Sequence, residues 1–316
     1  MLRVLLVKTS SLGDVVHNFP AATDIRRKFP DASIDWVVEE PFVPLVQMHP
    51  AVHRVVPVAV RRWRKSLLGP KTWSEVSEFR RLSQAELYDA IIDSQGLIKS
   101  AVVARMARGR LHGFDAGSAR EPLATRLYDV RHHVSRGAHA VTRNRLLAAS
   151  ALGYRFDSDV DYGIRTRVGR TDDVRACVFF HGTSRSDKLW PEENWIELGG
   201  TLNSLGISVV LPWGSDAERR RSEKLAEAIP GARVPGRMSF AELAGLMRSS
   251  AFVVGVDTGL THLSAALGIP VAAIFVASDP VKTGVHGAAL ALNLGNVGSP
   301  PESREVLDAL AGLKVL

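Results

Sequence analysis

The chain has 316 residues, of which 46% are hydrophobic and 23% charged, with a formal net charge of +7 and one cysteine. This composition excludes a disordered chain, and the lone Cys177 excludes an internal disulfide and a multi-cysteine zinc site. No apolar run approaches the ~20 residues of a membrane helix, and the apolar start at residues 4–7 is too short for a signal peptide. At about 150 residues per domain, we expect two domains in a soluble, cytoplasmic protein.

Strand and helix patterns alternate through the first half of the chain. The apolar run 2–8 predicts a buried strand that ends in a polar turn at Gly13 and Asp14, and residues 15–28 predict one helix. Further elements are expected as strands at 33–38, 52–58 and 88–93, and as a helix at 98–108. Such alternation predicts βα units around a parallel sheet.

The pattern fades between Tyr154 and Asp173 and then restarts, so we expect domains at 1–160 and 161–316. The second half predicts strands at 176–180, 207–211, 252–256 and 271–275, and helices at 192–205, 217–229, 239–248, 258–267 and 302–313. Two successive doubly wound halves are therefore expected. The last helix could pack back on the first domain.

The charge is unevenly distributed along the chain. Residues 1–170 carry 27 Lys+Arg and 17 Asp+Glu, a net of +10, whereas residues 171–316 carry 13 and 16, a net of −3. A general preference for arginine explains why only nine of the 40 basic residues are lysine, but it does not explain this asymmetry. We therefore expect the first half to bind something anionic.

Several familiar nucleotide and catalytic motifs are absent. No Gly-x-Gly-x-x-Gly follows a strand, and no Walker loop, His-Glu-x-x-His or Gly-x-Ser-x-Gly occurs, which disfavours a dinucleotide dehydrogenase. Asp157, Asp159 and Asp161 form two overlapping Asp-x-Asp patterns, but an EF-hand loop would need Gly at its sixth position and Glu at its twelfth. A solvated linker is the preferred interpretation of that segment.

Two aspartates directly follow predicted strands. Asp14 could accept a proton from a substrate hydroxyl, although an ordinary helix cap explains its position equally well. Asp257 occupies the corresponding turn of the second half, where the N–H groups of Thr258 and Gly259 would suit a phosphate. A phosphate would repel Asp257, so this carboxylate suits sugar hydroxyls, with capping again the alternative.

Two other segments favour anion binding. The run 181–191 combines glycine, small hydroxyl residues and Lys188 after a strand, which suits a diphosphate. The run Arg61-Arg62-Trp63-Arg64-Lys65 is basic with an aromatic residue inside it. A solvated face is the commonest origin of such a run, while the tryptophan and the basic half favour phosphate, nucleic acid or an anionic membrane.

Together, these motifs resemble one family. They are Lys8-Thr9-Ser10-Ser11-Leu12-Gly13-Asp14, Asp35-Trp36-Val37-Val38-Glu39-Glu40, Ile92-Asp93-Ser94-Gln95-Gly96-Leu97-Ile98-Lys99-Ser100, Ala119-Arg120-Glu121-Pro122-Leu123-Ala124 and the two second-half segments. In this order over nearly the whole chain, they resemble the ADP-heptose:lipopolysaccharide heptosyltransferases of glycosyltransferase family 9. The resemblance implies an α/β GT-B fold, with two Rossmann-like domains facing a central cleft, the acceptor on the first and the nucleotide sugar on the second.

The resemblance also implies the reaction. The family moves L-glycero-D-manno-heptose from ADP-heptose to the inner Kdo of Kdo–lipid A with inversion, without metal or cofactor. Such a protein would work at the cytoplasmic face of the inner membrane and would have no nucleic-acid partner. A family member acting on an already heptosylated acceptor is the first alternative. A non-catalytic nucleotide-sugar or nucleic-acid binding protein is a distant one, supported by the basic half alone.

Residue roles follow from the matched motifs. Asp14 matches the general base. The implied donor-binding residues are Thr183, Ser184, Lys188, Glu218, Met238, Asp257, Thr258, Gly259 and His262. Ser184 departs from a common threonine but keeps the hydroxyl. The implied acceptor-binding residues are Lys8, Ser10, Arg61, Arg62, Arg64, Lys65, Lys99 and Arg120.

Overall fold

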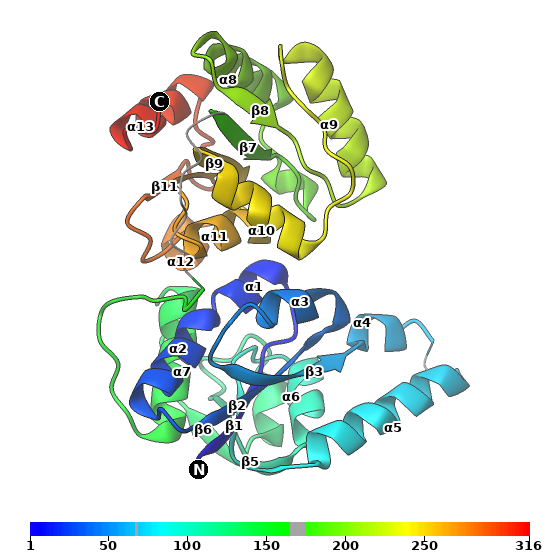
Figure 1. The fold of residues 1–316 in the computed structure, drawn as a ribbon. Coiled ribbons are helices and arrows are strands. Elements are labelled where there is room, and N and C mark those ends of the chain that lie inside the picture. Colours follow the sequence, from blue (N-terminus) through cyan, green and yellow to red (C-terminus); the bar gives the residue numbers. More distant parts are fainter. Residues whose placement is uncertain (67–68, 165–174) are drawn as a thin grey trace. The chain divides into compact units, whose positions relative to one another are not determined.

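The structure, a computed structural model, describes residues 1–66, 69–164 and 175–316. The chain divides into a first unit, Met1–Ile164, and a second unit, Arg165–Leu316, each built on a parallel sheet (Figure 1). The predicted α/β class is therefore confirmed. The boundary between the units lies after residue 164 of the chain, whereas the sequence analysis placed it after residue 160. Within the described residues, no helix is both long and apolar enough to cross a bilayer.

The sheet of the first unit has the strand order β3-β2-β1-β4-β5-β6 in the part of the chain that the structure describes. Its strands are β1 (Arg3–Val7), β2 (Ser33–Glu39), β3 (Val52–Val58), β4 (Leu87–Asp93), β5 (Arg108–Phe114) and β6 (Val130–His132). β1 pairs with β2 on one side and with β4 on the other. It is buried on both faces, which is why its sequence is a continuous apolar run.

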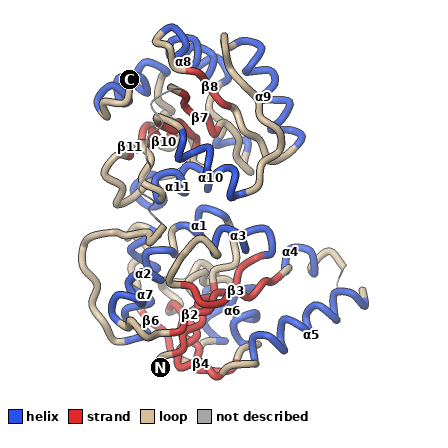
Figure 2. Tube along the Cα trace, in the orientation of Figure 1, coloured by secondary structure: helices blue, strands red, loops and turns tan. Residues whose placement is uncertain are grey.

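Helices cover both faces of this sheet (Figure 2). They are α1 (Leu12–Val16), α2 (Phe19–Lys28), α3 (Val43–Val46), α4 (Val60–Trp63), α5 (Pro70–Gln84), α6 (Ile98–Arg105) and α7 (Ala140–Leu152), with the 3-10 turns η1 (Glu40–Phe42) and η2 (Pro122–Leu127). Leu5 and Val7 of β1 share a core with Phe79 of α5 and Ala101 of α6. On the other face, α2 packs against α7.

Two predicted helices of the first unit were wrong in their bounds. Residues 15–28 form no single helix, because Pro20 lacks an N–H and starts a new helix, α2, behind its cap Asn18. The helix expected at 98–108 ends at Arg105, and Arg108 already begins β5. Gly109 allows this entry, since its φ is +154° and a Cβ there would lie 2.3 Å from the Tyr88 carbonyl oxygen.

The second unit repeats the same topology. Its described strands are β7 (Ala176–Phe180), β8 (Ser208–Val210), β9 (Phe252–Val256), β10 (Val271–Ile274) and β11 (Ala291–Leu294), in the order β11-β10-β9-β7-β8. A parallel bridge between Val210 and Arg233 adds a further position beside β8. With that bridge, both sheets follow the strand order of a dinucleotide-binding fold.

The helices of the second unit also lie on both faces of its sheet. They are α8 (Glu192–Ser204), α9 (Asp216–Ala228), α10 (Phe240–Ser249), α11 (Gly259–Ala266), α12 (Pro280–Thr283) and α13 (Ser303–Gly312), with the 3-10 turn η3 (Ser186–Lys188). The return of the last helix to the first domain, which the sequence left open, stays a prediction. Within the second unit, α13 packs against α8, and its Val306 and Leu310 lie in the core of this unit.

Candidate active site

Each sheet has a switch point, where connections leave the central strands toward opposite edges. It lies between β1 and β4 in the first sheet and between β7 and β9 in the second. Ligands of doubly wound sheets bind beyond the carboxyl ends of the strands at this point. The segments 8–14, 94–99, 181–188 and 257–262 directly follow these four strands. The candidate residues on them therefore form two groups, one in each unit.

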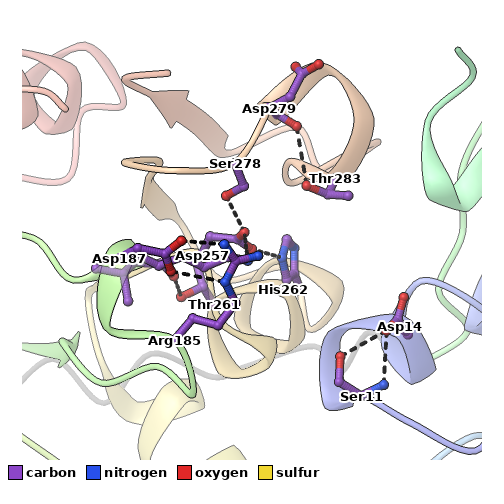
Figure 3. A network of polar contacts seen from close by, with 12 residues as sticks. Ser11, Asp14, Arg185, Asp187, Asp257, Thr261, His262, Ser278, Asp279 and Thr283 are labelled. Atoms are coloured by element: carbon purple, nitrogen blue, oxygen red, sulfur yellow. Dashed lines mark hydrogen bonds and ion pairs between the residues drawn. The ribbon is translucent and has the colours of Figure 1, made fainter. Parts of the chain in front are cut away.

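Asp14 lies in the first turn of α1, next to the loop that follows β1 (Figure 3). Its Oδ2 accepts hydrogen bonds from the backbone N–H and the hydroxyl of Ser11, both at 3.0 Å. Asp14 is thus part of a helix cap, as the sequence allowed. Its Oδ1 has no partner within the described chain, and the side chain is half-buried. One oxygen is held in place while the other can take a proton.

A glutamine that the sequence analysis gave no role holds the loop before Asp14. Gln95, at the carboxyl end of β4, accepts on Oε1 the backbone N–H and the hydroxyl of Thr9, each at 2.8 Å. Its Nε2 donates to the Ser10 carbonyl at 2.8 Å. The sequence feature that could have revealed Gln95 is its place in a polar segment directly after a predicted strand. Ser10 is buried beneath this clamp, and its contact with an acceptor stays a prediction.

Lys8 is buried between the two central strands of the first sheet. Its Nζ donates to the Ser94 carbonyl at 2.6 Å and to Asn144 Oδ1 at 3.3 Å. Burial lowers the pKa of Lys8 to about 8, although the negative charges of Asp14 and Asp93 oppose that shift. Lys8 thus links the loop after β1 to the loop after β4. Its predicted contact with the acceptor is not tested by this geometry.

The basic run at 61–65 contains both paired and unpaired members. Arg62 donates to both oxygens of Glu75, at 2.7 and 2.8 Å, and to Glu40 at 3.0 and 3.2 Å. Trp63 belongs to the core, and its Nε1 donates to Glu75 at 2.8 Å. The tryptophan therefore anchors the run instead of facing a ligand. Within this run, three cations are exposed and form no ion pair with the described chain, namely Arg61, Arg64 and Lys65.

Lys99 connects this run to the Asp14 loop. Its Nζ lies 3.4 Å from the Ser10 hydroxyl, and the side chain is half-buried in the first turn of α6. Burial and the nearby charge of Arg61 lower the pKa of Lys99, while Glu39 opposes them. Lys99 is thus close enough to Arg61 to form one basic surface with it.

Two arginines that the sequence analysis missed support the loop carrying Arg120. Arg143 of α7 donates to the Ser118 carbonyl at 2.7 Å, and Arg136 donates to the Ala119 carbonyl. Arg120 itself is exposed. No local pattern marks Arg136 or Arg143, because their partners lie about twenty residues away in the chain. Arg120 is therefore held on a fixed loop of the first unit.

Asp257 is the centre of the polar cluster in the second unit. Its Oδ2 accepts from Lys188 Nζ and from the Ser278 hydroxyl, each at 2.5 Å, and its Oδ1 accepts from His262 Nε2 at 3.1 Å (Figure 3). Burial alone would raise the pKa of Asp257, but the hydrogen bonds from His262, Lys188 and Ser278 outweigh it and hold the pKa below its usual range. Ser278 was missed by the sequence analysis; the signal was its place just after β10.

The loop after β7 lies against one face of α9. His181 is buried, and its Nε2 lies 2.8 Å from the Ser222 hydroxyl. A Cβ on Gly182 would lie 2.7 Å from Glu218 Oε1, one turn earlier on the same helix. Glycine therefore lets the Glu218 carboxylate lie directly on the loop. The predicted donor residues next along this loop are Thr183, which is half-buried, and Ser184, which is exposed.

The other predicted donor residues lie at helix starts. Glu218 Oε2 accepts the N–H of Gly214 at 2.8 Å in the capping box of α9. Thr258 is the N-cap of α11 and Gly259 is its first residue. The first N–H groups of α11 therefore point out of the N-terminal end of the helix and have no partner within it. Met238 is half-buried, two residues before α10. The second unit thus presents the Glu218 carboxylate, the first N–H groups of α11 and the Met238 thioether.

The aspartate triplet lies at the end of the first unit. Asp161 Oδ2 pairs with Arg27 at 2.5 Å. The backbone carbonyls of Asp157 and Asp159 both accept from Arg145 at 2.9 Å. These contacts fasten the segment to α2 and α7. The rest of the predicted linker, 165–174, lies outside the described residues.

Comparison with known proteins agrees with this geometry. The profile of glycosyltransferase family 9 (heptosyltransferase) matches residues 76–307. Lipopolysaccharide heptosyltransferase 1 of Escherichia coli K12 is 46% identical over 291 residues, which are 90% of this chain and 91% of that protein. The structure of E. coli heptosyltransferase WaaC with ADP is similar at a TM-score of 0.90 and 42% identity, covering 99% of this chain and all of that one (100%). The same enzyme with ADP-2-deoxy-2-fluoro heptose gives 0.87 and 41%, covering 98% and 99%. The predicted GT-B fold is thereby confirmed.

Proposed function

The chain belongs to glycosyltransferase family 9, the heptosyltransferases, and from this premise we propose that its first unit binds the acceptor and its second unit the donor. The enzyme transfers heptose from ADP-heptose in the synthesis of the lipopolysaccharide inner core. In the proposal, the acceptor is the inner Kdo sugar of Kdo–lipid A. The protein then works at the cytoplasmic face of the inner membrane, because its acceptor is a lipid.

Asp14 is the proposed general base. Its Oδ1 takes the proton of the attacking Kdo hydroxyl, whose oxygen forms a bond to the anomeric carbon of heptose. The bond from that carbon to the phosphate oxygen breaks, and ADP leaves with the electron pair. Attack from the face opposite ADP inverts the anomeric centre. The Ser11 hydrogen bonds to Oδ2 keep the carboxylate oriented during this step.

The second unit is proposed to hold ADP-heptose and to stabilise the departing diphosphate. Lys188 would leave Asp257 for the diphosphate, joined there by the N–H groups at the start of α11 and by the hydroxyls of Thr183 and Ser184. Asp257 Oδ2 would then accept a heptose hydroxyl. A cation and a helix N-terminus supply the charge stabilisation that a divalent cation supplies in other transferases. Glu218 is proposed for the ribose and Met238 for the adenine.

The observation that supports the proposal most strongly is the placement of these residues at the switch points of the two sheets. Asp14 follows β1 in the first sheet and Asp257 follows β9 in the second, in a chain 41% identical to an enzyme whose structure was determined with an ADP-heptose analogue. The main rival is heptosyltransferase II activity, which uses an already heptosylated acceptor. Offering purified enzyme the two acceptors separately decides between them. Turnover of the heptosylated acceptor alone would exclude Kdo–lipid A as the substrate.

The role of Asp14 can be separated from its capping. Asparagine keeps an oxygen for the Ser11 hydrogen bonds but cannot act as a base, so Asp14→Asn should lower kcat by about 10²–10⁴-fold. Donor affinity and melting temperature should stay unchanged. The matched comparison, Ser11→Ala, removes the hydroxyl hydrogen bond but keeps the carboxylate and the Ser11 N–H, so it should cost about 1 kcal/mol of stability and lower kcat far less than Asp14→Asn does. Equal kcat in Asp14→Asn and the unmodified enzyme would refute the base.

A further inference from the structure

Three large apolar side chains are exposed beside the acceptor residues of the first unit. Ile98 and Val102 of α6 are 41% and 43% exposed, and Leu123 of η2 is 57% exposed. The first two lie one turn apart on the same helix face. α6 packs against η2, so all three come from neighbouring elements. We call Ile98, Val102 and Leu123 the apolar patch.

Hydrogen bonds fix the two elements to one another. The Ile98 N–H donates to Glu121 Oε2 at 2.7 Å, and the Glu121 N–H donates to the Gly96 carbonyl at 3.0 Å. Leu123 follows Glu121 by two residues. The apolar patch is therefore formed by a rigid junction and not by a loose loop.

α6 exposes two branched apolar side chains, unlike an ordinary surface helix. Its buried residues are Ser100, Ala101, Val103 and Ala104, whereas Ile98 and Val102 are exposed. A helix that only covers the sheet would bury its largest apolar side chains and expose polar ones. Keeping two branched apolar side chains in water is better explained by a partner that covers them.

Basic residues surround the apolar patch. Lys99 follows Ile98 directly in the first turn of α6, and the exposed Arg61 is near enough for its charge to act on Lys99. Arg120 and Arg126 are both exposed and flank Leu123 at three residues on either side. Residues three apart lie above one another on a 3-10 helix, which places Arg126 over Leu123. Apolar side chains ringed by arginine and lysine match the boundary between acyl chains and anionic headgroups.

We propose that the apolar patch docks the first unit on an anionic lipid bilayer, with Lys99, Arg120 and Arg126 on the headgroup phosphates. The proposal rests on the proposed function, since an acceptor embedded in a bilayer must be reached from its surface. The patch would enter the boundary region next to the acceptor residues, so that the enzyme meets the sugar head of a lipid without extracting it.

The test uses vesicles of phosphatidylethanolamine and phosphatidylglycerol without acceptor. The double variant Val102→Gln/Leu123→Gln should sediment with vesicles about tenfold less than the unmodified enzyme, because both apolar side chains leave the bilayer. Leu87→Gln is the matched control: Leu87 is 62% exposed but begins β4, at the opposite end from the acceptor residues. It should bind vesicles like the unmodified enzyme.

Activity then separates docking from chemistry. On Kdo–lipid A in the same vesicles, the double variant should lose kcat/KM in parallel with its vesicle binding. On a deacylated, water-soluble Kdo acceptor it should match the unmodified enzyme. Unchanged vesicle binding by the double variant, an equal loss in Leu87→Gln, or lost activity on the soluble acceptor would each overturn the docking surface. If the unmodified enzyme binds vesicles but turns over neither acceptor, the proposed function fails while the docking surface stands.

Discussion

Asp14 and Asp257 differ in their hydrogen bonds, and the sequence placed them in corresponding turns although β7, not β9, is the counterpart of β1. Asp257 has both oxygens engaged, by the Lys188 ammonium, the Ser278 hydroxyl and the His262 ring, which favours its ionised form. Asp14 keeps one oxygen without a partner within the described chain. A permanently ionised carboxylate suits hydrogen bonds from a sugar, whereas a base must be able to gain a proton. The sequence predicted a possible cap at both positions and could not distinguish these environments.

Lys8 gives the clearest dependence of stability on pH at a single residue. Its pKa is about 8 in the folded chain, against an ordinary value of 10.5. Between these values the unfolded chain binds a proton that the folded chain has lost, so the free energy of unfolding rises with pH. The slope is about 1.4 kcal/mol per pH unit while Lys8 titrates. In Lys8→Met this contribution disappears.

Denaturant titrations of both proteins from pH 7 to pH 10.5 measure the difference. We expect the unmodified protein to gain up to about 3 kcal/mol relative to Lys8→Met over this range. Other groups that titrate there, such as tyrosines, are common to both and cancel. A constant difference at all pH values would mean that Lys8 is not desolvated in the folded chain.

At the scale of elements, the strands predicted best are those that are buried on both faces. β1, β7 and β9 are nearly continuous apolar runs, and the sequence placed their bounds within one residue. β5 begins Arg-Gly-Arg, and the sequence analysis missed it because that start looks like a loop. The short β6 and the helices α5 and α7 were missed as well. Long-range pairing, not local propensity, makes β5 and β6 regular.

The same distinction applies to the site. Spacing singled out residues after the predicted strands, including Asp14, Lys188 and Asp257, and their roles stay predictions. Gln95 and Ser278 also follow strands, but their importance depends on partners 85 and 21 residues away. Arg143 lies on a helix that the sequence did not predict. A partner so distant in the chain is visible only after the sheet has brought its strands together.

The contact between the β7 loop and α9 predicts an effect on donor binding. Gly182→Ala would place a Cβ 2.7 Å from Glu218 Oε1, so the carboxylate must move off the loop. Since Glu218 is proposed to hold the ribose, we expect the KM for ADP-heptose to rise about tenfold, with kcat little changed. Steady-state kinetics with ADP-heptose as the varied substrate measures this.

Gly200→Ala is the control for that prediction. Gly200 lies within α8, and a Cβ there meets no atom within 4 Å. The added methyl should stabilise the helix by up to about 1 kcal/mol and leave donor binding unchanged. A normal KM in Gly182→Ala would show that Glu218 does not depend on the loop for its position.

At the scale of the whole molecule, counting charge by the two structural units gives a different result from the division after residue 170. Residues 1–164 contain 24 Lys+Arg and 17 Asp+Glu, whereas residues 165–316 contain 16 of each. The entire net charge of +7 thus belongs to the first unit, and the second is neutral, not −3 as the earlier division suggested. The neutral second unit, to which we assign the diphosphate, would have to bind it with local groups such as Lys188. The first unit, to which we assign the acceptor, would attract it through its overall field.

That difference predicts a salt dependence for one substrate only. Replacing the unpaired cations Arg61, Arg64 and Lys65 by alanine should raise the KM for a deacylated Kdo acceptor by roughly a hundredfold at low salt, at about 1 kcal/mol per cation. The ratio to the unmodified enzyme should shrink toward one in 1 M salt, where the screening length is about 3 Å. Arg80→Ala removes an equally exposed cation from α5 and should change neither KM. The KM for ADP-heptose should also stay constant in the triple variant, because we assign that substrate to groups of the neutral second unit. A parallel rise in both KM values would contradict the separation of acceptor and donor between the two units.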